Sequence, residues 1–368
     1  MIVILRARHS RSLDEYSLDT RPDSPIVSVV VPARNEAHNI ERCIRSVLAS
    51  DYPRLEVIAV DDHSTDATGA ILRGIAREDA RLRVVVPPPL PDGWFGKQWA
   101  CSTGAAACSG DVIAFFDADT WQSADLIPRC VNAMRERDAD LLTVGGSQEL
   151  GSFWEKVLQP QVFTMILLQF GGTEAVNDSR HATRKIANGQ CIFVRRGPYE
   201  ALGGHGAVRD KVAEDLALAQ LYFRQGRRTV LILGLDQLYT RMYTSLRELI
   251  EGWGKNIFAG GRGVMPFGIF GQIIYPFALV AAPLINLVPA VVVALALVGL
   301  LGGSWLLWGG IALAGNVLWW LGVYWWLELS PLYALVHPLG AAVLLYIAVK
   351  SVIRGRRVRW KGRDYVAT

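Results

Sequence analysis

The stretch Asp111-Val-Ile-Ala-Phe-Phe-Asp-Ala-Asp119 is the best guide to the fold. Its apolar run, Val112–Phe116, predicts a strand covered on both faces, as in a parallel sheet. Two carboxylates, Asp117 and Asp119, stand where that strand ends, and open α/β sheets bind ligands outside the carboxyl ends of their strands. Carboxylates there can hold Mg²⁺ or Mn²⁺ together with a substrate phosphate. Alone, so short a tripeptide is more often only a solvated turn.

Strands and helices alternate upstream of this stretch, which predicts an α/β fold with a mostly parallel sheet and right-handed crossovers. Asn35 is expected to cap the first helix. The expected strands are 26–31, 55–60 and 82–86, and the expected helices are 36–49, 67–78 and 97–108.

Polar loops follow the first two of these strands. Pro32-Ala-Arg-Asn-Glu36 ends the first, and Asp61-Asp62 ends the second. Parallel strands bring these loops to the edge that carries Asp117 and Asp119. Neighbouring carboxylates repel unless a cation lies among them, so a divalent metal and a phosphate-bearing ligand are expected there.

Downstream, a helix at 124–137 and strands at 140–144 and 191–194 continue the domain. Residues 152–171 are apolar and suit either a core helix or one at a membrane surface. Glu214 and Asp215 open a helix that runs to about Gln225. The pair could also have a purely structural role, because acidic side chains in the first turn interact favourably with the helix dipole.

The C-terminal third predicts membrane sequence, because Gly263 to Leu327 contains no Asp, Glu, Lys or Arg. Four apolar blocks, 265–284, 285–303, 304–327 and 331–349, each approach the length of a span, with two spans as the alternative. The basic tail after Lys350 favours a cytoplasmic C-terminus. A multi-pass cell-membrane protein is therefore expected, with its polar N-terminal domain on the cytoplasmic side too.

Several classes of function are disfavoured. A GxGxxG fingerprint and a Walker loop are both absent, which argues against a dinucleotide or P-loop site. The five cysteines show no close pairing, so neither a disulfide framework nor a zinc site is expected. No nucleic-acid partner is expected.

Taken together, these motifs resemble the family 2 inverting glycosyltransferases with a GT-A fold over about residues 26–260. The resemblance rests on Val-Val-Val-Pro-Ala-Arg-Asn-Glu36, Val-Asp-Asp62-His-Ser-Thr-Asp, Lys97, Asp117-Ala-Asp119, Arg195-Arg196 with Gly203-Gly204, and Glu214-Asp215. The segments 93–97, 251–256 and 360–363 are similar to the membrane-bound branch that glycosylates carotenoid acids, hopanoid-type lipids or ceramide.

The resemblance implies a role for each matching residue. The donor, expected to be a UDP-sugar, would be bound by Pro32, Arg34, Glu36, Asp61, Asp62, Lys97 and Asp117. Asp119, with Asp117, would hold Mn²⁺ or Mg²⁺ on the diphosphate. Asp215 would be the general base on the acceptor, with Glu214 beside it. Trp253 and Lys255 would lie on the acceptor side or act as a gate.

The resulting hypothesis is an inverting, metal-dependent transferase that moves a sugar from a nucleotide sugar to a membrane lipid of carotenoid, hopanoid, sphingoid or polyprenyl type. A polysaccharide synthase is the alternative, although Gly252 precedes Trp253 where processive relatives carry Arg. A nucleotidyltransferase is less favoured because the first loop is not Gly-rich, and a membrane scaffold is disfavoured by the intact carboxylates.

The expected domain organisation has five parts. These are a poorly ordered segment at 1–25, a GT-A domain at 26–244, an amphipathic interfacial segment at 245–264, transmembrane helices at 265–349 and a basic cytoplasmic tail at 350–368.

Overall fold

The computed structural model describes residues 10–19, 21–355, 357–360 and 363–366. The chain divides into two compact units. The first, called the α/β unit, comprises residues 1–149, 170–242 and 359–368, and the second, called the helical unit, comprises residues 150–169 and 243–358.

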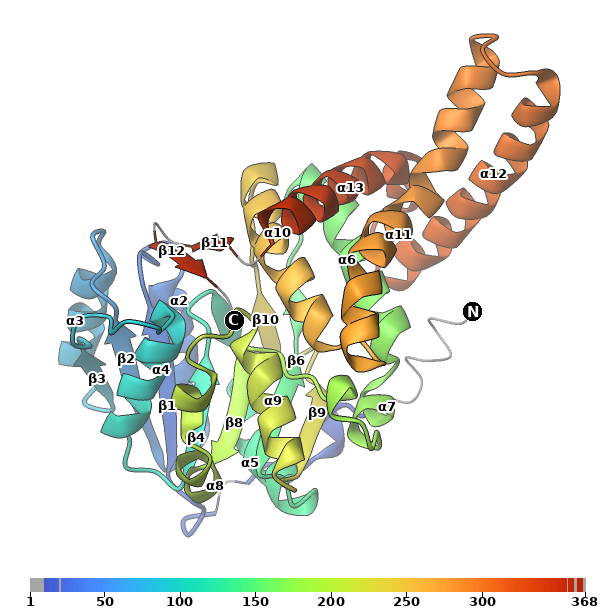
Figure 1. Ribbon diagram of the computed structural model, residues 1–368. Coiled ribbons are helices and arrows are strands. Elements are labelled where there is room, and N and C mark those ends of the chain that lie inside the picture. The colour runs from blue at the N-terminus through green and yellow to red at the C-terminus, as the bar shows by residue number, and fades with distance from the viewer. Residues whose placement is uncertain (1–9, 20, 356, 361–362, 367–368) are drawn as a thin grey trace. The chain divides into compact units, whose positions relative to one another are not determined.

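The α/β unit is built on a seven-stranded sheet in the order β3-β2-β1-β4-β8-β6-β9 (Figure 1). Its strands are β1 (Val27–Ala33), β2 (Leu55–Asp61), β3 (Leu82–Val85), β4 (Val112–Phe116), β6 (Leu141–Gly145), β8 (Cys191–Arg195) and β9 (Thr229–Leu233). β8 alone runs antiparallel to its neighbours, so the prediction of a mostly parallel sheet is confirmed.

Helices cover both faces of this sheet, because alternate residues of each buried strand point to opposite sides. Val29 and Val31 of β1 join one apolar cluster with α2, α3 and α5, and Val30 joins the other with α4, α8 and α9. The helices are α2 (Ile40–Leu48), α3 (Thr68–Glu78), α4 (Gly96–Ala107), α5 (Leu126–Glu136), α7 (Thr173–Asn177), α8 (Arg196–Ala201) and α9 (Glu214–Arg224).

Shorter elements complete the unit. A small sheet, β5-β10-β7, follows the end of β4. It consists of β5 (Thr120–Gln122), β7 (Ser147–Gln148) and β10 (Leu238–Thr240), while single 3-10 turns are η1 (Leu13–Glu15), η2 (Ala182–Arg184) and η3 (Gly204–Val208). The strands of the small sheet are too short to show a period in the sequence.

Two local predictions are corrected. Asn35 does not cap a helix; it takes a left-handed φ of 54°, and its side-chain oxygen accepts a hydrogen bond from the Thr65 backbone N–H at 2.8 Å. Residues 10–19 and 21–25 are packed rather than poorly ordered, because Leu13 is fully buried and Ser12 bridges Leu233. The rest of that prediction, residues 1–9 and 20, lies outside the described residues.

The helical unit combines an early helix with the C-terminal ones. Leu158 and Val162 of α6 are buried against Leu249 and Trp253 of α10 and Leu344 of α13. Its elements are α6 (Phe153–Phe170), α10 (Leu246–Gly263), α11 (Gly268–Leu297), α12 (Gly303–Trp326), η4 (Pro331–Val336) and α13 (His337–Arg354). The apolar stretch at 152–171 is therefore a helix whose partners come from the far end of the sequence.

Prolines inside these helices leave carbonyls without an intrahelical donor, and side chains of neighbouring helices supply one. Pro160 frees the carbonyl of Lys156, which accepts a hydrogen bond from the Tyr324 hydroxyl at 3.0 Å. Pro289 frees the carbonyl of Ile285, which accepts one from the Asn316 amide at 2.9 Å. At these two positions the helix continues through proline and the freed carbonyl still accepts a hydrogen bond.

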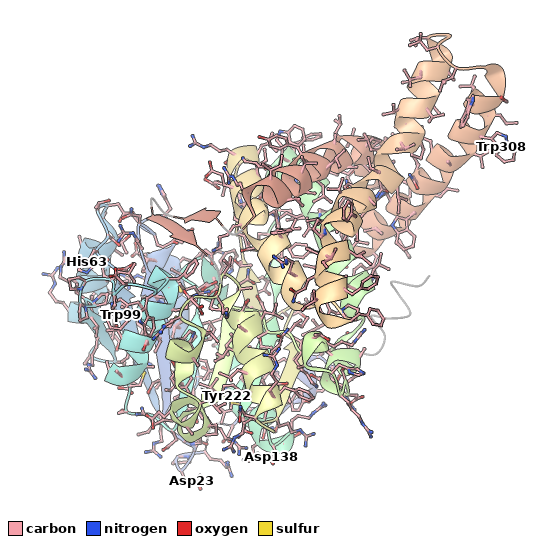
Figure 2. All side chains as sticks on the ribbon, in the orientation of Figure 1. Asp23, His63, Trp99, Asp138, Tyr222 and Trp308 are labelled. Atoms are coloured by element: carbon pink, nitrogen blue, oxygen red, sulfur yellow. The ribbon has the colours of Figure 1, made fainter. Side chains whose placement is uncertain are left out.

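Three helical segments of the described chain are long and apolar enough to cross a membrane: Gly268–Leu297, Gly303–Trp326 and Pro331–Arg354. The expectation of four spans is wrong, because the blocks 265–284 and 285–303 join into the single helix α11. Figure 1 shows α11 and α12 side by side as a hairpin, and Trp308 stands on the outside of α12 in Figure 2.

The predicted tail at 350–368 is only partly described. α13 ends at Arg354, and β11 (Arg357–Trp360) pairs with β12 (Arg363–Val366) in a two-stranded sheet. Residues 356, 361–362 and 367–368 lie outside the described residues.

Candidate active site

A lysine at the carboxyl edge of the main sheet joins two elements that are far apart in the sequence. The Lys97 ammonium, in the first turn of α4, lies 2.7 Å from the Asp117 carboxylate after β4 and 2.7 Å from the Glu214 carboxylate at the start of α9. Burial alone would lower the pKa of Lys97, but Asp117 and Glu214 together raise this pKa well above its ordinary value. The lysine is therefore a permanent cation between two carboxylates.

Asp215 lies beside this ion network with its carboxylate held by backbone donors. One oxygen accepts a hydrogen bond from the Gly189 N–H at 2.9 Å and the other from the Leu216 N–H at 2.7 Å. Burial, followed by the nearby Glu214 charge, raises the pKa of Asp215 to about 6. Its carboxylate is consequently a stronger base than an ordinary aspartate, yet it is ionised at neutral pH.

The loops after β1 and β2 contact one another at the same edge. The Arg34 guanidinium donates to the Asp62 backbone oxygen at 2.6 Å and lies 3.8 Å from its carboxylate. Asp61 accepts from the Ser64 N–H at 3.0 Å, and the Glu36 N–H donates to the Thr68 hydroxyl at 2.8 Å. Pro32 lies in β1 opposite Val60, one residue before Asp61 in the neighbouring strand. The structure thus gathers Pro32, Arg34, Glu36, Asp61 and Asp62 into one pair of loops.

The backbone of the Asp117-Ala-Asp119 turn is fixed on two sides. The Thr120 hydroxyl donates to the Asp117 carbonyl at 2.7 Å, and the Thr240 hydroxyl of the small sheet donates to the Asp119 carbonyl at 3.1 Å. Within the described chain there is no group of three or more His, Cys, Asp or Glu that could hold a metal by itself. A pair of carboxylates still fits Mg²⁺ or Mn²⁺, since such ions commonly take their remaining oxygen ligands from phosphates and water.

Sequence reasoning missed the segment that positions Asp215. Besides the Gly189 contact, the Asn188 amide donates to the Val144 carbonyl at 2.8 Å and to the Gln190 side chain at 3.2 Å. The Gln190 carbonyl in turn accepts from the Asp117 N–H at 3.2 Å. A Cβ at Gly189 would stand 2.9 Å from the Asp215 carboxylate, so glycine is required for this close approach. The only available signal was Asn-Gly-Gln before a strand.

Trp253 and Lys255 belong to the helical unit rather than to this edge. Trp253 is 6% exposed and packs edge-on against Phe163 and Tyr243. This environment is that of a core residue of the helical unit. Their expected place on the acceptor side stays a prediction.

Comparisons with known proteins show what the chain and its fold are similar to. Residues 28–203 match the model of glycosyl transferase family 2. A 4,4'-diaponeurosporenoate glycosyltransferase from Staphylococcus aureus is 27% identical over 260 residues, which cover 70% of this chain and 67% of that protein. A mannosyltransferase from Pyrobaculum calidifontis, solved in complex with GDP-Man and Mn²⁺, is 21% identical with a TM-score of 0.55, covering 95% of this chain and 93% of that one. The structural likeness shows the fold.

Proposed function

We propose that this enzyme transfers a sugar from a nucleotide-sugar donor to a membrane lipid, with inversion of the anomeric centre, because residues 28–203 match the model of glycosyl transferase family 2. The observation that carries the proposal is the juxtaposition of the Asp117–Lys97–Glu214 ion network with the partly buried Asp215, whose pKa is raised. The proposed donor-side residues, Lys97 and Asp117, are far in the sequence from the proposed base, Asp215, and they meet at one edge of the sheet.

The donor's nucleoside would lie against the paired loops after β1 and β2, where Arg34, Asp61 and Asp62 are held together. Lys97 would sit near the diphosphate. Asp117 and Asp119 would hold Mn²⁺ or Mg²⁺, which would act as a Lewis acid stabilising the charge of the leaving nucleoside diphosphate. A UDP-sugar is the proposed donor.

Asp215 would accept the proton of the acceptor's hydroxyl as that hydroxyl oxygen attacks the sugar. A positioned carboxylate assists such a step by about 10²–10⁴-fold. The Gly189 and Leu216 N–H groups fix the orientation of the carboxylate, and Glu214 keeps its pKa raised. Attack from the side of a single base, opposite the leaving group, gives inversion.

A lipid acceptor is supported by the three apolar helical segments and by the 4,4'-diaponeurosporenoate glycosyltransferases, whose name denotes a carotenoid acid. Carotenoid, hopanoid, sphingoid and polyprenyl lipids share a reactive polar group on an apolar body. Such an acceptor would reach an enzyme anchored in the same membrane. The proposed location is therefore the cell membrane, with the catalytic unit in the cytoplasm.

A cytoplasmic tail on the same side requires an even number of crossings, although three candidates are present. We propose that α11 and α12 cross as a hairpin. In the most apolar stretch of each helix, only 11% of α11 and 17% of α12 is buried within the protein. The corresponding share is 39% for the segment that contains α13. α13 packs along α10 and would lie at the membrane surface. A reporter fused after Thr368 should then be active in the cytoplasm, and activity only outside the cytoplasm would refute this topology.

The central experiment incubates detergent-solubilised enzyme with single nucleotide sugars and lipid extract, followed by mass spectrometry of the lipids. A glycosylated lipid should form, and the coupling constant of its anomeric proton should show inversion. Asp215→Asn should abolish the product. Equal glycosylation of water-soluble sugars or proteins would refute the lipid acceptor, and a retained configuration would refute the mechanism.

A further inference from the structure

A cavity of about 290 Å³ lies in the α/β unit at the edge opposite the candidate active site. It is formed where α5 ends and β9 begins, at the amino ends of the parallel strands β6 and β9. The lining residues are Arg137, Asn177, Asp178, Ser179, Arg180, Lys185, Phe223, Gly226, Arg227, Arg228, Thr229 and Val230. None of them belongs to the proposed transferase machinery.

The lining is strongly basic. It contains five cationic side chains and a single acidic one, Asp178. Glu174 lies 3.2 Å from Arg137 and pairs with it. For Arg180, Lys185 and Arg228, no salt bridge is found anywhere in the part of the chain that the structure describes. Like charges held together in this way repel, and a bound anion would remove that cost.

Lys185 forms the floor of the cavity and is only 3% exposed. Its ammonium donates to the Val176 carbonyl at 2.9 Å and the Asn177 carbonyl at 2.6 Å, and lies 4.9 Å from the centre of the Phe223 ring. An ammonium has three N–H donors, so these two bonds leave one. Burial lowers the pKa of Lys185, and the nearby Asp178 charge opposes this shift.

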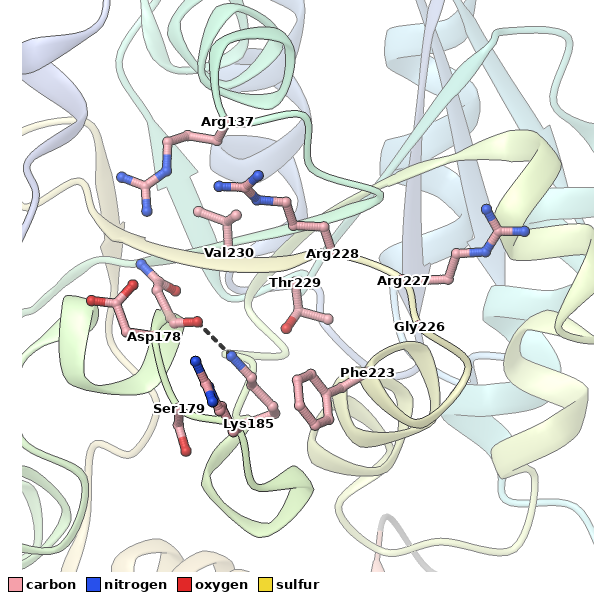
Figure 3. Close-up of a pocket in the computed structure, with 12 residues that line it drawn as sticks. Arg137, Asp178, Ser179, Lys185, Phe223, Gly226, Arg227, Arg228, Thr229 and Val230 are labelled. Atoms are coloured by element: carbon pink, nitrogen blue, oxygen red, sulfur yellow. Dashed lines mark hydrogen bonds between the residues drawn. The ribbon is translucent and has the colours of Figure 1, made fainter.

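Other basic side chains lie around the same space. Figure 3 shows Arg137 and Arg228 on one side of the cavity, Lys185 and Phe223 on the other, and Thr229 between them, while Arg227 extends to the side. Guanidinium groups bind oxyanions with two parallel N–H donors, and the Ser179 and Thr229 hydroxyls can add neutral donors. The lining thus offers many donors and few acceptors.

We propose that this cavity binds a phosphate-type oxyanion, either free or as the headgroup of a lipid or other phosphomonoester. Its volume accommodates a phosphate and part of the attached group. The site is separate from the donor site: α9 has Glu214 and Asp215 in its first turn and Phe223 in its last, and Asp215 and Phe223 are about 12 Å apart along the helix at 1.5 Å per residue. Binding here can therefore be tested without reference to sugar transfer.

The test measures thermal unfolding of the full chain in detergent against added inorganic phosphate, with chelator present and ionic strength held constant. A ligand that binds only the folded state raises the midpoint. The key variant is Arg180→Ala with Arg228→Ala, both exposed positions where folding should survive. Arg77→Ala is the matched control, because Arg77 is exposed on α3 beside the β3 end of the sheet.

Wild type and Arg77→Ala should be stabilised at the same phosphate concentration. The double variant should need at least about tenfold more, since each lost charged hydrogen bond weakens binding by that order. Arg180→Lys with Arg228→Lys should recover part of the affinity.

A second arm compares dihexanoyl phosphatidic acid with dihexanoyl phosphatidylcholine. Stabilisation by phosphatidic acid but not by inorganic phosphate would identify a lipid headgroup as the ligand, and the reverse a free phosphate. The proposal is overturned if no phosphate compound stabilises the wild type, or if the double variant responds at the wild-type concentration.

Discussion

The two units of this protein satisfy their buried polar groups in different ways. In the α/β unit, charged side chains form salt bridges with one another, as the Lys97 ammonium does with the Asp117 and Glu214 carboxylates. In the helical unit, neutral donors reach backbone carbonyls that prolines have freed, as Tyr324 does for Lys156. A carbonyl freed in an apolar surrounding is costly unless a donor reaches it, and a neutral hydroxyl or amide can do so without adding charge. The residues proposed to bind the donor and to act as the base all belong to the first unit.

The strongest test of this contrast is Asp215→Asn. Loss of the base should lower sugar transfer by about 10²–10⁴-fold. As a mere acid in the first turn of α9, Asp215 would contribute only about 0.3–1 kcal/mol of stability and nothing to rate. The measurement is the single-turnover transfer rate together with donor affinity, which should be unchanged. A variant that transfers sugar at nearly the wild-type rate would rule out Asp215 as the base.

Asp119→Ala addresses the proposed metal site. Removing one of two carboxylates should lower transfer by about 10²–10³-fold, the range found when one electrostatic stabiliser is lost. Excess chelator should have a similar effect on the wild type, reversed by Mn²⁺ or Mg²⁺. Donor affinity with and without metal is the second readout. Full activity in chelator would refute metal dependence.

Lys97→Met should destabilise the α/β unit. The change leaves Asp117 and Glu214 close together without their cation, at an expected cost of about 3 kcal/mol. Denaturant unfolding of the full chain in detergent measures the loss. Adding Glu214→Gln should recover part of it, since one of the two charges is then gone. No recovery in the double variant would show that Lys97 acts through packing instead.

Tyr324→Phe probes the helical unit by the same logic. The Lys156 carbonyl would lose its donor, which should cost about 1–2 kcal/mol. In a Pro160→Ala background, residue 160 regains an N–H for that carbonyl, so Tyr324→Phe should cost much less. Thermal unfolding of the four proteins in this cycle gives the coupling. Equal losses in both backgrounds would contradict the compensation.

The smallest effect concerns pH. The pKa of Asp215 is raised to about 6, so the protonated form is favoured in the folded state. Protonated Asp215 therefore stabilises the folded state at pH values below its pKa in the unfolded chain. This contribution to stability is lost as the pH rises from that unfolded-state pKa to about 6. Transfer should conversely fall below pH 6. In Glu214→Gln the acidic limb of the kcat/KM profile should move to lower pH, and an unmoved limb would exclude Glu214 as the cause.

The sequence by itself determined the features that depend on local pattern. The strand Val112–Phe116, the mostly parallel sheet and the family 2 resemblance are all confirmed. Burial on both faces imposes a continuous apolar run, and alternation of strands with helices leaves few topologies, so these features can be read along the chain. The order of the motifs also indicated which residues gather at the sheet edge, although their roles stay predictions.

Only the tertiary structure decided which distant groups meet. Lys97 pairs with Glu214, Gly189 holds Asp215, and α6 packs with helices from the other end of the chain, because each partner is selected by the fold and not by spacing. The lengths of the apolar blocks suggested separate spans at 265–284 and 285–303, yet one helix continues through its prolines and the block boundary, and Asn316 supplies a donor to the carbonyl freed by Pro289. Such compensation joins residues of different helices, and no local pattern in the sequence records it.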